Sequence, residues 1–165
     1  MFNYAPPHFP NIPVSYEDPV LYSPREELSE KGRAVFENLK PLNVLIPKFF
    51  SDEFMYMYIA FPDDDLYYTY PAHTQFVEFW AFTRPWYSGA VERNGDIYIT
   101  EPYQDAFTGE WIITISRAIY KPDGTLRGVF GVDYFGSYFY SDIAMATILD
   151  TGFAVMVSNG GPVVS

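Results

Sequence analysis

The sequence predicts an α+β domain in which an antiparallel β-sheet is flanked by α-helices. Two observations support this prediction. Segments rich in strand-forming residues come in consecutive pairs joined by tight-turn sequences, and segments with helical spacing or helix-start signals stand between the pairs. The 165 residues suit a single domain, and the 48% of apolar residues are enough for a sizeable core.

Residues 1–24 are rich in proline and aromatic residues, which predicts an extended lead-in that lies on the fold. The next segment, SPREELSEKGRAVFENLK, has a start signal at Ser23 or Pro24, acids in its first turn and Lys40 near its end. These signals predict a helix with one apolar face. That face would be formed by Leu28, Val35, Phe36 and Leu39.

Residues 53–61 and 66–70 are predicted to form a β-hairpin around the turn PDDD at 62–65. Apolar and aromatic residues alternate along the first of these strands. The alternation predicts one face with Tyr56 and Tyr58 and another with Met57 and Ile59.

Two short helices are predicted next, over 74–82 and 84–92, the second with Pro85 at its first helical position. The sequence NGD then signals a tight turn. The remaining expected elements are strands 109–120 and 125–134 around the turn KPDG, a helix over 138–149 and a final strand over 152–158. We therefore expect a domain over 25–158, followed by a truncated C-terminal turn at 159–165.

Composition excludes several classes of function. A formal net charge of −11 argues against nucleic-acid binding and against docking to anionic lipid. The chain has no cysteine, so it has no disulfide framework and no thiolate metal site. It contains neither a run of about 18 apolar residues nor a signal-peptide pattern, so we expect membrane attachment only through segments absent from this chain.

Two acidic residues, Asp105 and Asp133, lie next to apolar or aromatic residues in the sequence. Alternation along 125–134 puts Asp133 on the same side as Gly131 and Val129, and a glycine there lets another group approach the sheet closely. Asp105 lies in loop-like sequence before strand 109–120. An ionised acid that is buried needs partners. Structural roles stay equally open: Asp105 as the cap of a turn and Asp133 as the cap of the following helix.

Three sequence blocks resemble the Cache domain, the extracellular sensor module of prokaryotic chemoreceptors and sensor kinases. They are FWAFTRPWYSGA, ITEPYQDAFTGEWIITISRAI and GTLRGVFGVDY, which occur in the family's order within residues 76–135, with looser agreement over 27–158. The resemblance implies a PAS-like antiparallel sheet, a long N-terminal helix and a ligand pocket on one sheet face. It further implies the membrane-distal unit of a double-Cache receptor on the extracellular or periplasmic face, without enzyme activity or cofactor. A homodimer in the full receptor stays open.

One subset of the family resembles amino-acid sensors, and this chain matches its motif at Arg84, Trp86, Tyr87, Tyr103, Asp105 and Asp133. The resemblance implies that Arg84 holds the ligand carboxylate through a bidentate fork, with the Trp86 indole N–H as a further donor. Asp105 and Asp133 would accept from the ammonium group, and Tyr103 would add its hydroxyl.

The sequence is also compatible with different functions. The subset has a tyrosine five residues before the arginine, where this chain has Phe79 as a pocket-lining residue, so a biogenic amine or a related small molecule is a second ligand class. A third interpretation is a structural interaction module, as in calcium-channel auxiliary subunits. Two further interpretations have less support from the sequence. One is a carboxylate pair for glycoside hydrolysis, with Glu101 nearby, and the other is a calcium site at PDDD. With only His8 and His73, a histidine metal site is not expected.

Overall fold

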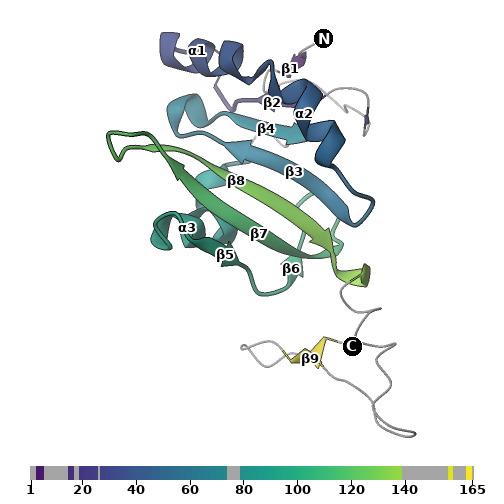
Figure 1. The fold of residues 1–165 in the computed structure, drawn as a ribbon. Helices are drawn as coiled ribbons and strands as arrows, with labels where there is room; N and C mark the ends of the chain where they lie inside the picture. The colour runs from purple at the N-terminus through teal and green to yellow at the C-terminus, as the bar shows by residue number, and fades with distance from the viewer. Residues whose placement is uncertain are drawn as a thin grey trace, which may run out of the picture.

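The structure is a computed structural model that describes residues 3–5, 15–16, 19–25, 27–73, 79–138, 156–157 and 163–164. Its centre is a twisted sheet with the strand order β1-β2-β4-β3-β8-β7-β5, and β6 also pairs with β7 (Figure 1). All neighbours in this sheet are antiparallel except β1 and β2, which are parallel. The α+β architecture with an antiparallel sheet is therefore confirmed.

The strands of the sheet are β1 (Asn3–Ala5), β2 (Val20–Tyr22), β3 (Phe54–Ala60), β4 (Tyr67–Tyr70), β5 (Ile97–Ile99), β6 (Tyr103–Gln104), β7 (Trp111–Tyr120) and β8 (Leu126–Phe135). The α-helices are α1 (Glu30–Leu39), α2 (Leu42–Phe49) and α3 (Pro85–Glu92), with short 3-10 turns η1 (Asp63–Asp65) and η2 (Ala81–Thr83). A separate antiparallel pair consists of β9 (Met156–Val157) and β10 (Val163–Val164).

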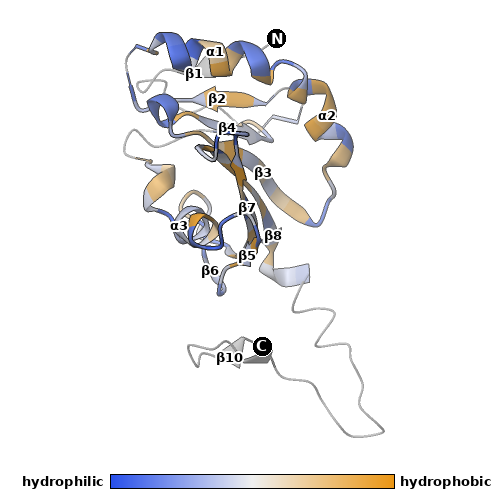
Figure 2. Cartoon of the chain, turned by 60° about the vertical axis from the view of Figure 1, so that its left-hand side comes forward, coloured by the Kyte–Doolittle hydropathy of each residue, from blue (hydrophilic) through white to orange (hydrophobic). Residues whose placement is uncertain are grey.

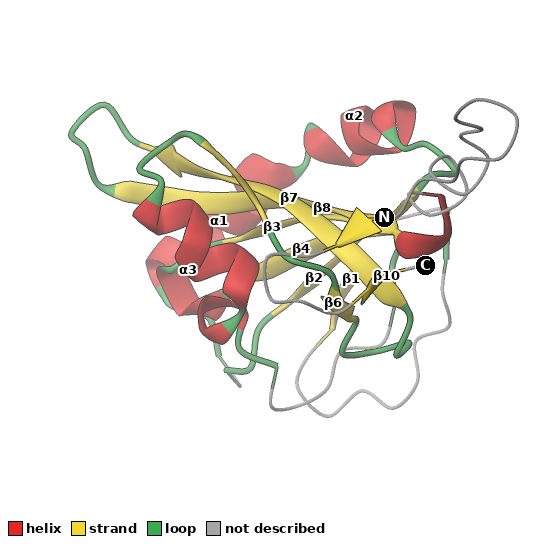
Figure 3. Cartoon of the chain, turned by 90° about the horizontal axis from the view of Figure 1, so that it is seen from below, coloured by secondary structure: helices red, strands yellow, loops and turns green. Residues whose placement is uncertain are grey.

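Helices cover both faces of the sheet. Figure 3 shows α2 on one side of the sheet and α3 on the other. The core divides in the same way, because Met57 and Ile59 of β3 pack in one cluster with Leu39 of α1, whereas Tyr56 and Tyr58 pack in the other with α3. Figure 2 accordingly shows hydrophobic residues along the central strands and α2. The two faces predicted from the alternation in β3 are confirmed.

The first helix begins later than predicted. The sequence signals favoured a start at Ser23 or Pro24, but α1 begins at Glu30 and its N-cap is Ser29, whose hydroxyl accepts a hydrogen bond from the Gly32 amide. Ser23 instead donates its hydroxyl to the backbone carbonyl of Asp64. The earlier serine is thus used in a long-range contact, and the helix is short.

Both long hairpins have the predicted form. β3 pairs with β4 around PDDD, and β7 pairs with β8 around KPDG. Residues 1–24 were expected to be extended, and in the structure three of them form β2, a buried strand that pairs with β4. No helix in the described parts of the chain has the length and apolar character needed to cross a membrane.

Three predictions fall mainly outside the described residues. Of the helix expected over 74–82, residues 79–82 are described: Trp80 is extended and Ala81–Thr83 forms only a 3-10 turn, so this part of the prediction is wrong. Of the helix expected over 138–149, only residue 138 is described, and it is helical. Of the strand expected over 152–158, the described residues are those of β9.

Candidate functional site

Asp133 lies in the middle of the sheet. Its strand, β8, runs between β3 and β7, and the register places it opposite Tyr56 on one side and Thr114 on the other. Two residues earlier, Gly131 lies opposite Tyr58. A Cβ atom at Gly131 would be 2.3 Å from the Tyr58 ring, so only glycine leaves room for that ring. The predicted close approach at Gly131 is confirmed, and the approaching group is Tyr58.

Asp133 is 4% exposed and uses one carboxylate oxygen for contacts within the protein. Its Oδ1 accepts hydrogen bonds from the Tyr58 hydroxyl at 2.6 Å and from Thr114 Oγ1 at 2.5 Å. Thr114 Oγ1 in turn lies 2.6 Å from the Tyr103 hydroxyl. Within the described residues Asp133 Oδ2 has no hydrogen-bond partner, so one oxygen stays available. Asp133 therefore does not act as a helix cap.

Burial makes Asp133 hard to ionise. Desolvation raises the pKa of its carboxyl from 3.8 to about 7; the hydrogen bonds from Thr114 and Tyr58 oppose the rise, and the charge of Asp105 adds to it. Burial, and then the negative charge of Asp133, also raise the pKa of Tyr58 well above its usual range. The Tyr58 hydroxyl therefore stays protonated and donates. A cation beside Asp133 would favour the ionised carboxylate.

Asp105 closes the turn before β7, as one of the two open interpretations expected. Its Oδ2 accepts hydrogen bonds from the amides of Phe107 and Thr108 and from the Thr108 hydroxyl. The side chain is nevertheless buried, with 7% exposed. Its other oxygen, Oδ1, accepts no hydrogen bond from any residue that the structure describes. Asp105 can therefore cap the turn and still present an acceptor to the cavity.

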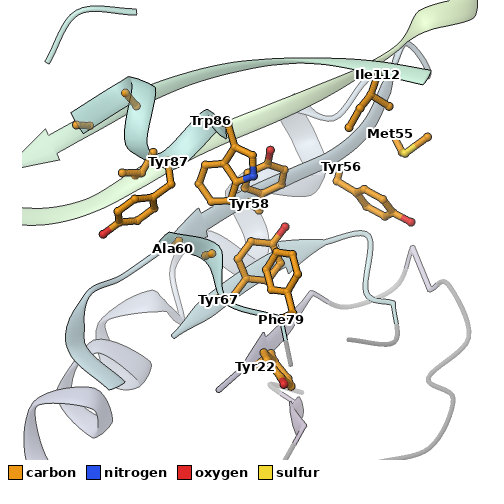
Figure 4. Close-up of a cluster of buried hydrophobic side chains, with 14 residues drawn as sticks. Tyr22, Met55, Tyr56, Tyr58, Ala60, Tyr67, Phe79, Trp86, Tyr87 and Ile112 are labelled. Atoms are coloured by element: carbon orange, nitrogen blue, oxygen red, sulfur yellow. The ribbon is translucent and has the colours of Figure 1, made fainter. Parts of the chain in front are cut away.

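Helix α3 carries the second half of the site. Pro85 starts the helix, as predicted, and the Ser116 hydroxyl of β7 donates to the backbone carbonyl of Trp86 at 2.8 Å, which ties the first turn to the sheet. The Trp86 ring is buried, and its centroid lies 4.7 Å from that of Tyr58 (Figure 4). Trp86 is thereby brought to the same region as Asp133.

Arg84 immediately precedes this helix. Its guanidinium carbon lies 4.9 Å from the centre of the Phe79 ring, a cation–π contact. Its Nε atom is buried and has no hydrogen-bond partner among the residues described. A buried N–H donor without a partner is costly, and a carboxylate is the group that a guanidinium pairs with best.

These residues surround one cavity, of about 20 Å³, which by this measure holds about one water molecule. Its lining consists of Tyr56, Tyr58, Tyr67, Phe79, Arg84, Trp86, Tyr103, Asp105, Ala106, Phe107 and Asp133. All but one of the predicted site residues are among them. A ligand larger than water has to displace aromatic side chains in order to enter.

The exception is Tyr87. It is not among the residues that line the cavity; its ring packs edge-on against Trp86, with the centroids 5.8 Å apart, and Figure 4 shows it on the side of Trp86 away from Tyr56. Consecutive residues of a helix point in different directions, and of this pair Trp86 is the one that lines the cavity. The prediction of Tyr87 as a contact residue is not supported by this arrangement.

The hydrogen-bond partners of Asp133 were not predicted from the sequence. Tyr58 and Thr114 were not proposed as site residues, nor were Tyr56, Tyr67, Ala106 and Phe107 of the lining. The sequence did predict which face of its own strand each residue occupies: Tyr58 shares a face of the first strand with Tyr56, and Asp133 shares a face of a later strand with Gly131. Only the pairing of β3 with β8 shows that the two faces coincide.

Acids of the PDDD turn, which the sequence raised as possible metal ligands, and His73 contact other residues of the protein. Within the described residues no group of three or more histidines and acids lies close enough together to hold a metal ion. In the PDDD turn, Asp64 accepts hydrogen bonds from Ser29, and Asp65 pairs with Arg25 at 2.8 Å. His73 is buried against Tyr56, and desolvation lowers its pKa to about 4.

Comparisons with known proteins place the chain in a family context. The family model for the first PDC sensor domain of methyl-accepting chemotaxis protein-like sequences matches residues 32–136, more than half of the chain. A curated relative, methyl-accepting chemotaxis protein McpC of Bacillus subtilis, is 30% identical over 112 residues, which cover 67% of this chain and 17% of that protein. The chain thus spans less than a fifth of that relative.

Solved structures with the same fold are ligand-binding domains of chemoreceptors. That of CtaA from Pseudomonas fluorescens, in complex with L-serine, has a TM-score of 0.58 and 32% identity over 67% of this chain and 47% of its own. The ligand-binding domain of the amino-acid chemoreceptor PctC from Pseudomonas aeruginosa, in complex with GABA, has a TM-score of 0.57 and 25% identity. The match covers 67% of this chain and 48% of that domain. The chain spans about half of each of these domains.

Proposed function

This chain belongs to the family of first PDC sensor domains of methyl-accepting chemotaxis protein-like sequences, in agreement with the resemblance seen in its sequence, and from this premise we propose that it binds a free amino acid. The observation that carries the proposal is the arrangement of charge around one cavity. Arg84 lines this cavity with a buried Nε that has no partner among the described residues, and Asp105 and Asp133 each offer an oxygen that accepts no hydrogen bond from those residues.

An α-amino acid suits this set of groups. Its carboxylate would pair with Arg84, and its ammonium would donate to Asp133 Oδ2 and Asp105 Oδ1. The ammonium would also restore the ionised form of Asp133, which burial disfavours in the free protein. Aromatic rings of Trp86 and Phe79 would then enclose the ligand's apolar atoms.

Binding has to open the cavity. Because the free cavity has only about 20 Å³, the ligand would move side chains that join α3 to the sheet, among them Trp86 and Tyr58. A ligand that binds the opened form better shifts the population toward it. In a full-length receptor, this shift would be the signal passed to membrane segments outside this chain. The domain would perform no chemistry and would face the outside of the cell.

Two other candidates have support from particular observations. The related PctC domain binds GABA, whose ammonium group lies far from its carboxylate. In this chain Phe79 brings no hydroxyl to the cavity lining. These two observations favour an amine or a longer amino compound as a second candidate ligand. The small free cavity favours an interaction module, in which aromatic side chains simply fill the space.

A thermal-shift screen against the twenty amino acids, biogenic amines and GABA distinguishes these candidates. A ligand that binds the native state raises the melting temperature when it is well above its dissociation constant. The amino-acid proposal predicts a shift that Arg84→Ala and Asp133→Asn each abolish and that Arg93→Ala, a control at the other end of α3, leaves unchanged. A shift with amines alone that survives Arg84→Ala would support the second candidate. No shift in a well-folded sample would favour the interaction module.

A further inference from the structure

The sheet face opposite the candidate site carries a second and larger concavity. A groove of about 640 Å³ is lined by residues of α1 and of the end of the β7–β8 hairpin. Its volume falls within the range of small-molecule pockets, about 300–1,000 Å³. It is lined by Lys31, Ala34, Val35, Asn38, Leu39, Leu42, Ile59, Phe61, Asp63, Ile119, Lys121, Arg127 and Gly128.

The inner surface of this groove is apolar. Leu39 and Ile59 are buried members of the second core cluster, against which Val35 and Leu42 also pack. Ile119, at the outer edge, has 41% of its surface exposed. The groove therefore offers continuous apolar contact area that is accessible from solvent.

The rim of the groove is positively charged. Lys31, Lys121 and Arg127 are exposed, and none of their side chains forms an ion pair or a hydrogen bond with the part of the chain that the structure describes. Among the described residues of the lining, Asp63 is the one acid. Asp123 lies on the same turn as Lys121, and the positive charge of Lys121 contributes to lowering the pKa of Asp123. The chain has only 10 lysines and arginines against 21 acids. Three of these cations around one apolar groove thus make a local positive site on an acidic protein.

We propose that this groove is a second binding site, for a small organic anion with an apolar body, such as a medium-chain monocarboxylate. The apolar body lies along Val35, Ile59 and Ile119, and the anionic group lies between Lys121 and Arg127. The proposal does not rest on the amino-acid site, which is on the other face of the sheet. The two sites share one strand, since β3 directs Tyr58 to the first and Ile59 to the second.

The test uses sodium octanoate as the probe and methyl NMR of the whole chain as the readout. Octanoate should shift the methyl signals of Val35, Ile59 and Ile119 in a saturable manner. Acetate has the charge without the tail, and octyltrimethylammonium has the tail with the opposite charge; both should bind at least about tenfold more weakly. Equal binding of octyltrimethylammonium would overturn the proposal, as would shifts confined to Ile112 and Val129 on the opposite face.

Variants test the role of the cations. The double variant Lys121→Gln/Arg127→Gln removes two exposed charges and should weaken octanoate binding about tenfold without unfolding the protein. Lys48→Gln, in the last turn of α2 and outside the groove lining, is the matched control and should bind octanoate as the unchanged chain does. Unaltered affinity in the double variant, or an equal loss in both variants, would contradict the proposed site.

Discussion

Amino-acid binding by this domain should strengthen as the pH rises from 6 to 8, because the ligand ammonium pairs with the ionised form of Asp133. In the free protein burial holds the pKa of Asp133 at about 7. About a tenth of the molecules are then ionised at pH 6 and about nine tenths at pH 8. If the ligand binds only the ionised form, its affinity rises about tenfold over this interval.

Few other groups near the site titrate in this range. Burial lowers the pKa of His73 to about 4, and burial raises the pKa values of Tyr56, Tyr58 and Tyr103 above their usual range. The α-ammonium and carboxylate of a free amino acid also keep their charges between pH 6 and 8. The pH dependence of affinity would therefore report mainly on Asp133.

Titration calorimetry in buffers of different ionisation enthalpy measures the affinity and the protons released together. Binding should release about 0.9 proton at pH 6 and about 0.1 at pH 8. Thr114→Val removes a hydrogen bond that holds the pKa of Asp133 down, so the rise in affinity should move to higher pH. Asp133→Asn should bind weakly at every pH. A wild-type affinity that is constant or decreases from pH 6 to 8 would refute the reasoning.

Three further outcomes follow from the same contacts. Without ligand, the folded protein binds the Asp133 proton more tightly than the unfolded chain does. The free energy of unfolding, measured by urea titration, should therefore decrease as the pH rises from about 4 to 7. The decrease should be up to about 4 kcal/mol larger than in Asp133→Asn. Gly131→Ala puts a Cβ atom 2.3 Å from the Tyr58 ring, and should cost about 1–3 kcal/mol of stability together with ligand binding; a stable variant that still binds would contradict this. Ser29→Ala removes the cap of α1 and should cost about 1 kcal/mol in the same titrations, with no effect on ligand affinity.

The local features of the fold could be predicted from the sequence. Alternation and turn residues are properties of neighbouring positions, and they were sufficient for both long hairpins, for the two faces of β3 and for Pro85 at the start of α3. The same alternation put Asp133 on the face of Gly131, where the structure places the candidate site.

Features that depend on distant contacts could not be predicted. The choice of Ser29 over Ser23 as the start of α1 depends on Asp64, which lies 35 residues beyond Ser29 and accepts hydrogen bonds from it. The Tyr58 hydroxyl reaches Asp133 across 75 residues of sequence. Such contacts follow from strand order, which short-range patterns do not encode. Tyr87 matches the motif but does not line the cavity, because a sequence motif specifies the identity of a residue and not its direction on the helix.

The most direct test of the account is a crystal structure of the chain with the amino acid that gives the largest thermal shift. We expect the ligand in the cavity beside Trp86, with its ammonium nitrogen about 2.8 Å from oxygens of Asp133 and Asp105 and its carboxylate paired with Arg84. We also expect an opened arrangement of Trp86 and Tyr58. A ligand bound elsewhere, or one whose ammonium faces away from Asp133, would contradict the central claim.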